Sequence, residues 1–284
     1  MKVGVWGLGS MGIGMAQSLV RDGHEVAGFD VRDVTLDGSV DLDVSEMEAA
    51  VLVVLNAQQV EVILTGEDGL IGRLPSGAVV LNCATVSPDF ARRMEARCQE
   101  AQLQYLDSPI SGGAARSAQG DLAIMASGTP RAFECARPVL DATASSVYEM
   151  GDSAGAGSAM KAVNQILAGV HIASMAEAMV FGLTQGISAD RFMEIIPQCG
   201  GTSWMLENRG PHVRDADYHP HSAVDIWPKD LNIVKEIAAG AGMELPLTEA
   251  ALRQYDTASA DGFGREDDAA VAKAYAKQAK VDLP

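Results

Sequence analysis

Apolar runs and helical patterns alternate along the first half of the chain. A run such as Val51–Leu55 is apolar at every position, which is typical of a strand buried on both faces of a parallel sheet. Helix-forming stretches separate these runs, so the pattern predicts a doubly wound α/β domain over residues 1–154. The predicted strands are Val3–Trp6, Val26–Phe29, Val51–Leu55, Ala78–Asn82, Gln104–Leu106, Leu122–Ala126 and Ser146–Tyr148.

The pattern changes in the second half, where no run predicts a strand. Residues from Ser158 to Gly186 contain no proline and are rich in alanine, methionine and leucine, as expected of one long helix joining the two parts. An all-helical domain is therefore predicted over residues 155–284. Its further helices are expected at Ala189–Ile196, Leu231–Ala241, Leu247–Ala260 and Glu266–Ala279.

A glycine-rich turn links the first predicted strand to the first predicted helix. Gly7 permits a tight turn, Gly9 lets the backbone approach a pyrophosphate, and Gly12 lets helix and strand pack closely. The pyrophosphate would meet free N–H groups at the helix N-terminus. This arrangement predicts a Rossmann-type domain that binds a dinucleotide through Gly7, Leu8, Gly9, Ser10, Met11 and Gly12.

Asp30 ends the second predicted strand and bears on the choice of dinucleotide. A carboxylate at this point accepts hydrogen bonds from ribose hydroxyls and repels a 2′-phosphate, which favours NAD over NADP. Arg32 leaves the alternative open, because its guanidinium could hold that phosphate.

The segment between Asp30 and Val51 is short for its place in such a domain. A helix with a further strand would need about 25–30 residues. We therefore expect a loop and a short helix around Ser45–Ala50, with a more open adenine pocket.

Composition and charge narrow the classes of partner. The net charge of −17 argues against nucleic acid and anionic membrane surfaces. The four cysteines lack metal-ligand spacing, and His219, His221 and Asp225 show no firm ligand pattern, so no metal is expected. The first strand begins at the N-terminus, leaving no room for a signal peptide, and no apolar run is expected to reach membrane-spanning length. A cytoplasmic protein is predicted.

Two later segments carry candidate polar groups. Ser111-Gly112-Gly113 offers a hydroxyl and backbone N–H groups suited to a carboxylate, although an ordinary Gly-Gly turn has the same sequence. Lys161, Asn164 and Gln165 share one face of the long predicted helix. From spacing alone, the lysine is either a functional amine or a surface residue with a buried stem.

In order along the chain, these motifs resemble the β-hydroxyacid dehydrogenase family, which includes 3-hydroxyisobutyrate dehydrogenase. The resemblance rests on Gly7–Gly12, Ala84–Pro88, Ser111–Gly113, Gly155–Asn164 and Lys229-Asp230-Leu231. It implies hydride transfer between NAD and a small anionic hydroxy acid, with a homodimer or homotetramer as the assembly.

The resemblance also implies a role for each matching residue. Lys161 corresponds to the catalytic general acid/base, and Ser111, Gly112 and Gly113 to the cradle of the substrate carboxylate. Asn164 and Gln165 would orient substrate hydroxyls, although many family members carry asparagine where Gln165 stands. The residues implied to contact the cofactor, beyond the glycine turn and Asp30, are Leu55, Asn56, Thr85 and Lys229.

Within the family, the chain most resembles the L-threonate dehydrogenase branch, which oxidises a four-carbon sugar acid. The matching segments are Leu167–Ala173, Ser203–Arg209, His219–Ile226 and Gly264–Asp268. The alternatives are 3-hydroxyisobutyrate dehydrogenase or tartronate semialdehyde reductase, and, more remotely, an imine reductase or a non-catalytic cofactor-binding protein. Substrate specificity in such families changes with a few pocket residues.

Overall fold

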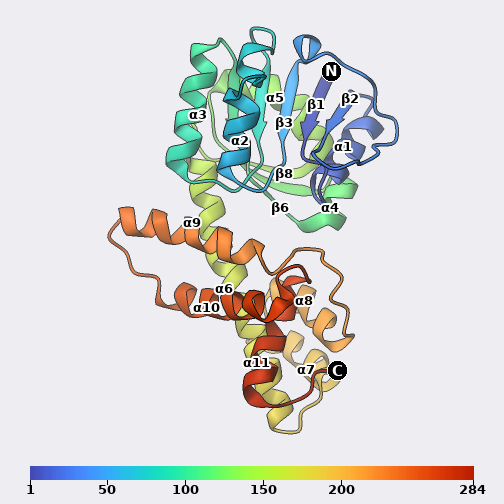
Figure 1. Cartoon of the computed structure of the whole chain (residues 1–284), viewed down its shortest axis with the longest axis vertical. Helices are drawn as coiled ribbons and strands as arrows, with labels where there is room; N and C mark the ends of the chain where they lie inside the picture. The colour runs from blue at the N-terminus through green and yellow to red at the C-terminus, as the bar shows by residue number, and fades with distance from the viewer. The chain divides into compact units, whose positions relative to one another are not determined.

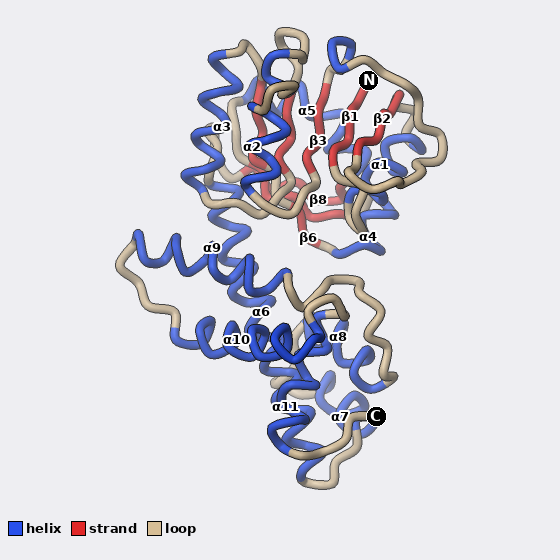
Figure 2. Tube along the Cα trace, in the orientation of Figure 1, coloured by secondary structure: helices blue, strands red, loops and turns tan.

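The computed structural model describes all 284 residues, in two units, Met1–Lys161 and Ala162–Pro284. Strands occur only in the first unit, and the second is built from helices (Figure 2). The elements of the first unit (Figure 1) are β1 (Lys2–Trp6), α1 (Gly12–Arg21), β2 (Glu25–Phe29), η1 (Val44–Glu46), β3 (Ala49–Leu52), α2 (Ala57–Thr65), η2 (Leu70–Gly72), β4 (Val79–Asn82), α3 (Pro88–Glu100), β5 (Gln104–Asp107), β6 (Ile110–Ser111), α4 (Gly113–Gln119), β7 (Leu122–Ala126), α5 (Pro130–Thr143) and β8 (Ala144–Glu149).

A five-stranded parallel sheet forms the centre of the first unit, in the order β2-β1-β3-β4-β5. Alternate side chains of each strand enter two different cores. In β4, Val79 and Leu81 pack with α1 and α5, whereas Val80 packs with α2 and α3. Burial on both faces explains the continuous apolar runs, and the predicted doubly wound parallel sheet is confirmed.

The last two predicted strands of this unit lie in a separate sheet. β7 pairs in parallel with β8, and β6 pairs antiparallel with β7. The two-residue strand β6 was not predicted, because it is too short to produce an apolar pattern.

Two local predictions near Val51 were wrong in their extent. The strand expected at Val51–Leu55 is Ala49–Leu52, because the chain must leave the sheet to reach Asn56, whose side chain caps α2. The helix expected at Ser45–Ala50 is only the 3₁₀ turn η1, capped by Asp43, since Ala49 already belongs to β3.

The elements of the second unit begin with the long helix α6 (Ala156–Thr184), which starts in the first unit and continues into the second. They continue with α7 (Ala189–Ile195), η3 (Ile196–Gln198), α8 (Trp204–Arg214), α9 (Ile226–Gly240), α10 (Pro246–Ala258), the π turn η4 (Ser259–Phe263), η5 (Asp268–Ala270) and α11 (Val271–Ala279).

The predicted all-helical second half is confirmed, with differences at single helices. Helix α8 was missed, because Gly210 and Pro211 interrupt its pattern, although Ser203 caps its start. Helix α9 begins five residues before the predicted Leu231; its Pro228 stands in the first turn, where a helix has unpaired N–H groups anyway. The helix predicted from Glu266 starts only at Val271, after η5.

Helix α6 is an exception to the expected absence of membrane-spanning runs. Its length and mean hydropathy of 1.7 would suffice to cross a membrane, but 44% of its apolar window is buried inside the structure. Ile172, Met175, Ala176 and Met179 belong to the hydrophobic core of the second unit. Burial in this core accounts for part of the apolar composition of α6.

Candidate active site

The glycine turn after β1 has the geometry predicted for a dinucleotide cradle. Gly7 has φ +92°, and a Cβ there would lie 2.3 Å from the carbonyl oxygen of Val53. A Cβ on Gly12 would lie 1.8 Å from the carbonyl oxygen of Gly7, so helix and strand can approach only with glycine. A Cβ on Gly9 would meet no atom within 4 Å. Gly9 thus borders open space at the start of α1, and the cradle fits a pyrophosphate.

Asp30, at the end of β2, is tied to both the glycine turn and Arg32. Its Oδ2 accepts a hydrogen bond from the Leu8 amide at 2.7 Å. The Arg32 guanidinium donates to both carboxylate oxygens, at 2.9 and 3.0 Å. These Arg32 hydrogen bonds hold the pKa of Asp30 well below its usual range. The carboxylate is therefore ionised and pre-positioned beside the turn.

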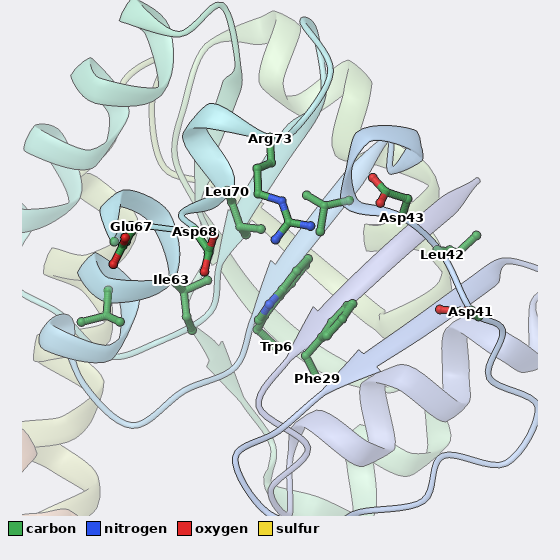
Figure 3. A pocket seen from close by; sticks show the side chains of 13 residues that line it. Trp6, Phe29, Asp41, Leu42, Asp43, Ile63, Glu67, Asp68, Leu70 and Arg73 are labelled. Atoms are coloured by element: carbon green, nitrogen blue, oxygen red, sulfur yellow. The ribbon is translucent and has the colours of Figure 1, made fainter.

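A hollow of about 610 Å³ lies beside the ends of β1 and β2 (Figure 3). Its floor includes Trp6 and Phe29, the last residues of β1 and β2, whose rings stack with centroids 4.5 Å apart. Leu70 and Arg73 line one side and Leu42 and its neighbours another. Residues 41–44, in the short segment after β2, contribute to the lining of this hollow.

Three further residues predicted to contact the cofactor follow β3 and β4. Leu55 is 59% exposed, and its amide donates to the side chain of Gln59 at 2.8 Å. Asn56 Oδ1 accepts from the Gln59 amide at 2.9 Å, so this side chain already caps α2. Thr85 is half-buried in the loop between β4 and α3. All three stand beyond the carboxyl ends of parallel strands, the edge at which such sheets bind ligands.

The predicted carboxylate cradle forms the junction between β6 and α4. Gly112 and Gly113 both have positive φ, +140° and +77°, which explains the glycine pair. A Cβ on Gly113 would meet no atom within 4 Å, so its backbone faces open space. Ser111 ends β6 next to these amides.

Lys161 is brought to this cradle within the first unit. Its Nζ donates a hydrogen bond of 2.9 Å to the carbonyl oxygen of Ile110, the residue directly before Ser111. The side chain is half-buried and occupies the second turn of α6. The Lys161 amine therefore lies beside the turn that contains Ser111, Gly112 and Gly113.

The start of α6 is anchored by Asp107, which the sequence reading missed. This fully buried carboxylate accepts hydrogen bonds from the amides of Gly155 and Ser158, both at 2.9 Å, and from Ser158 Oγ at 2.6 Å. Burial raises the pKa of Asp107 above its ordinary value. Asp107 serves as an external cap for the helix that carries Lys161, and only its place before Ser108-Pro109 signalled it.

In the second unit, Asn164, Gln165, Asp230 and Lys229 form one connected network. Asn164 Nδ2 donates to Gln165 Oε1 at 2.9 Å, and Gln165 Nε2 donates to Asp230 Oδ2 at 2.6 Å. Lys229 Nζ lies 2.5 Å from the other oxygen of Asp230. The predicted residues Asn164, Gln165 and Lys229 are thus linked through Asp230, which was not predicted although it follows Lys229 directly.

The histidines near α8 and α9 pack together without forming a metal site. His212 Nδ1 lies 2.8 Å from Asp267, and its ring centroid lies 5.2 Å from that of His221. No group of three or more histidine, cysteine, aspartate or glutamate residues is arranged to hold a metal ion.

Comparison with known proteins fits this geometry. Residues 2–151 match the NAD-binding domain of 6-phosphogluconate dehydrogenase, and residues 155–275 match the NAD-binding family of NADP-dependent 3-hydroxyisobutyrate dehydrogenase. The chain belongs to the 3-hydroxyisobutyrate dehydrogenase-like family of β-hydroxyacid dehydrogenases. As a member of this family it is an oxidoreductase that acts on CH–OH groups, and its cofactor is NAD.

Individual members of this family are similar over nearly their whole length. An L-threonate dehydrogenase of Cupriavidus necator is 44% identical over 96% of this chain and 96% of its own. An L-threonate dehydrogenase of Pectobacterium atrosepticum is 43% identical, over 96% and 93%. The crystal structure of a 3-hydroxyisobutyrate dehydrogenase from Salmonella typhimurium has a TM-score of 0.90 and 42% identity, over 96% and 99%.

Proposed function

We propose that this dehydrogenase oxidises a hydroxyl group of a four-carbon sugar acid, with L-threonate as the substrate, and that Lys161 is its general acid/base. The observation that carries the proposal is the hydrogen bond from Lys161 Nζ to Ile110, directly before the Ser111-Gly112-Gly113 turn. A proton acceptor beside a carboxylate cradle suits a hydroxy acid.

In the proposed reaction, Ser111 and the amides of Gly112 and Gly113 hold the substrate carboxylate. Lys161 accepts the proton of the substrate hydroxyl as the carbon gives up its hydride, and a carbonyl remains; in reverse, Lys161 donates that proton. When bound, NAD supplies the hydride acceptor. The protein contributes position and proton transfer.

The cofactor would be held by the glycine turn, through Gly7, Leu8, Gly9, Ser10, Met11 and Gly12, and by Asp30 at the ribose. Open space at Gly9 and the ionised carboxylate of Asp30 support these assignments. Leu55, Asn56 and Thr85 are assigned to the nicotinamide side because they follow neighbouring parallel strands. Lys229, 27% exposed, is assigned to the cofactor by the family resemblance.

The choice of substrate is supported by polar groups that a methyl-bearing acid could not satisfy. Asn164 is half-buried, and its carboxamide belongs to the network that also contains Gln165, Asp230 and Lys229. A buried polar group left unpaired costs about 1–3 kcal/mol, so a polyhydroxylated acid should be favoured. The curated relatives at 43% and 44% identity are L-threonate dehydrogenases.

We also propose a cytoplasmic homodimer or homotetramer. Val163, Leu167 and Phe181, on the part of α6 in the second unit, are 51%, 53% and 64% exposed. Exposed apolar side chains recurring on one helix are typical of a surface covered by another subunit. Light scattering coupled to gel filtration would show a mass two or four times 29.8 kDa, and a monomer would contradict this part of the proposal.

The decisive experiment compares substrates of matched charge. NADH formation would be followed with L-threonate, 3-hydroxyisobutyrate and glycerate, and NADH consumption with tartronate semialdehyde. We expect L-threonate to exceed 3-hydroxyisobutyrate in kcat/KM by at least about tenfold, equal to about 1.4 kcal/mol. A better rate with 3-hydroxyisobutyrate, the substrate named for the Salmonella relative, would contradict the sugar-acid assignment and leave the family unchanged.

A further inference from the structure

Two hydrogen bonds join the segment at the end of β5 to the first two turns of α6, and both lie inside the first unit. One runs from Ser158 Oγ to Asp107 Oδ1 at 2.6 Å. The other runs from Lys161 Nζ to the carbonyl oxygen of Ile110 at 2.9 Å. In each pair the residues are 51 positions apart in the chain. The segment and the helix are therefore held together at two points with the same offset, and Lys161 follows one turn after the residue that Asp107 binds.

Asp107 determines where the first turn of α6 lies against β5. Its Oδ2 accepts hydrogen bonds from the amides of Gly155 and Ser158, both at 2.9 Å, in addition to the Ser158 hydroxyl on Oδ1. The carboxylate is fully buried, so losing these donors would leave a buried polar group without a partner. The start of α6 therefore has one favoured position.

The packing at Gly157 shows how closely the helix approaches the strands. A Cβ there would lie 2.3 Å from the carbonyl oxygen of Met125 and 2.9 Å from that of Asp107, so only glycine allows this approach. The Gly157 amide donates to Ser127 Oγ at 2.9 Å, and Ser127 Oγ donates to Asp107 Oδ2 at 3.3 Å. The first turn of α6 is thus fixed by backbone packing as well as by hydrogen bonds.

We propose that Asp107 is a positioning residue that places the amine of Lys161 beside the turn at Ser111–Gly113. Because Asp107 is fully buried, it acts through Ser158 and the first turn of α6 and not on the substrate directly. This inference rests on the proposed role of Lys161 as general acid/base and names the group that holds it in place. Proton transfer needs the amine within hydrogen-bond reach of the substrate hydroxyl, and a displacement of about 1 Å can cost about 10²-fold in rate.

Two substitutions at Asp107 separate its geometry from its charge. Asp107→Ala removes every hydrogen bond of the side chain. Asp107→Asn keeps an oxygen for the two amides, and its NH₂ group can donate to Ser158 Oγ, since a hydroxyl accepts as well as donates. We expect Asp107→Ala to lower kcat at least about tenfold and Asp107→Asn to stay within about threefold of the original, because the side chain supplies placement.

A double-mutant cycle with Lys161 separates positioning from a structural role. Once the amine is removed, Asp107 has nothing left to place. Asp107→Ala/Lys161→Ala should therefore have the kcat of Lys161→Ala to within about twofold, whereas independent losses would multiply. The rates are measured at saturating NAD with the hydroxy acid that the unmodified enzyme oxidises fastest. If Asp107→Ala does not fold, Ser158→Ala, which removes a single hydroxyl, replaces it in the cycle.

Thr129→Ala is the matched control. Thr129 caps α5 by accepting a hydrogen bond from the Ala132 amide at 3.1 Å, so this variant also loses a side-chain cap of a helix in the first unit. We expect its thermal midpoint to fall, since such a cap is worth about 1 kcal/mol, and its kcat to stay unchanged.

Chemical labelling measures the placement of Lys161 without turnover. Trace acetylation read by mass spectrometry should show a more reactive Lys161 in Asp107→Ala and Ser158→Ala, because the hydrogen bond to Ile110 is lost. Reactivity should be unchanged in Asp107→Asn and Thr129→Ala.

The outcomes distinguish this inference from the proposed function. If Lys161→Ala keeps about a third or more of the turnover, the proposed role of Lys161 is wrong, and the labelling alone decides whether Asp107 places this amine. The inference is overturned when Asp107→Ala and Ser158→Ala leave both kcat and the labelling of Lys161 unchanged. It is equally overturned when the two losses multiply in the double-mutant cycle.

Discussion

The guanidinium of Arg32 donates two hydrogen bonds to the carboxylate of Asp30, from Nε at 2.9 Å and from Nη2 at 3.0 Å. Asp30, which favours NAD, and Arg32, which could hold the 2′-phosphate of NADP, are therefore hydrogen-bonded to each other. While this pair persists, Arg32 is committed to the acid and is not available to a 2′-phosphate. The pair supports NAD as the preferred dinucleotide.

The first prediction concerns this preference. We expect kcat/KM with NAD to exceed that with NADP at least tenfold, about 1.4 kcal/mol. Asp30→Ser removes the repulsive carboxylate and releases Arg32, so the preference should shrink or invert. Asp30→Ser/Arg32→Ala should lose the NADP gain, because the guanidinium is gone. Equal use of both cofactors by the unmodified enzyme would contradict the role of Asp30.

The same pair predicts a pH dependence of stability. Arg32 lowers the pKa of Asp30 in the folded protein below its usual 3.8, so the ionised acid stabilises the fold above that pH. This contribution is lost as the pH falls through the lowered folded value. Urea unfolding between pH 7 and pH 2.5 should show a steeper loss of unfolding free energy for the original chain than for Asp30→Asn. Asp37→Asn, on the exposed loop, should follow the original chain.

The glycine turn allows cofactor binding to be separated from folding. Gly9→Ala adds a methyl group where no atom lies within 4 Å, so the thermal midpoint should change little, while NAD affinity falls at least about tenfold by obstruction. Gly12→Ala meets the carbonyl oxygen of Gly7 and should destabilise the protein by about 2 kcal/mol or more. Unchanged NAD affinity in a folded Gly9→Ala variant would refute the cradle.

Lys161 provides the test of proton transfer. Lys161→Ala should lower kcat by about 10²–10⁴ and leave the NAD dissociation constant nearly unchanged. Lys161→Arg should fail as well, because a guanidinium does not release its proton near neutral pH. Rapid-quench or steady-state rates with saturating NAD give kcat. Retention of a third of the original turnover by Lys161→Ala would reduce the residue to a structural contact with Ile110.

Much of the fold was predictable because burial imposes simple periodicities. Strands such as β1 and β4 lie between two layers of helices, so their apolar runs are visible without a structure. Helix α8 was not predicted, because Gly210 and Pro211 interrupt its helical pattern. Strand β6 was not predicted, because it is only two residues long.

Residues of the candidate site could be predicted only where they belong to a recognisable sequence motif. Lys161 and the glycines occur at recognisable spacings, whereas Asp107 and Asp230 act through hydrogen bonds to residues 48 to 65 positions away. Such partners are determined by tertiary packing and leave no periodic signal in the chain. The hydrogen bond between Gln165 and Asp230 is one such link.

The short segment between β2 and β3 also affects the tendency of the protein to aggregate. β2 is an edge strand, and an uncovered edge invites a strand from another molecule. Val40 donates its amide to the carbonyl of Val26, and buried Leu36 holds the loop against the domain. Asp33, Asp37 and Asp41 are exposed along the same loop. A loop, and not a further strand, follows the outer edge of β2. Its exposed carboxylates repel strands of other molecules and so oppose aggregation.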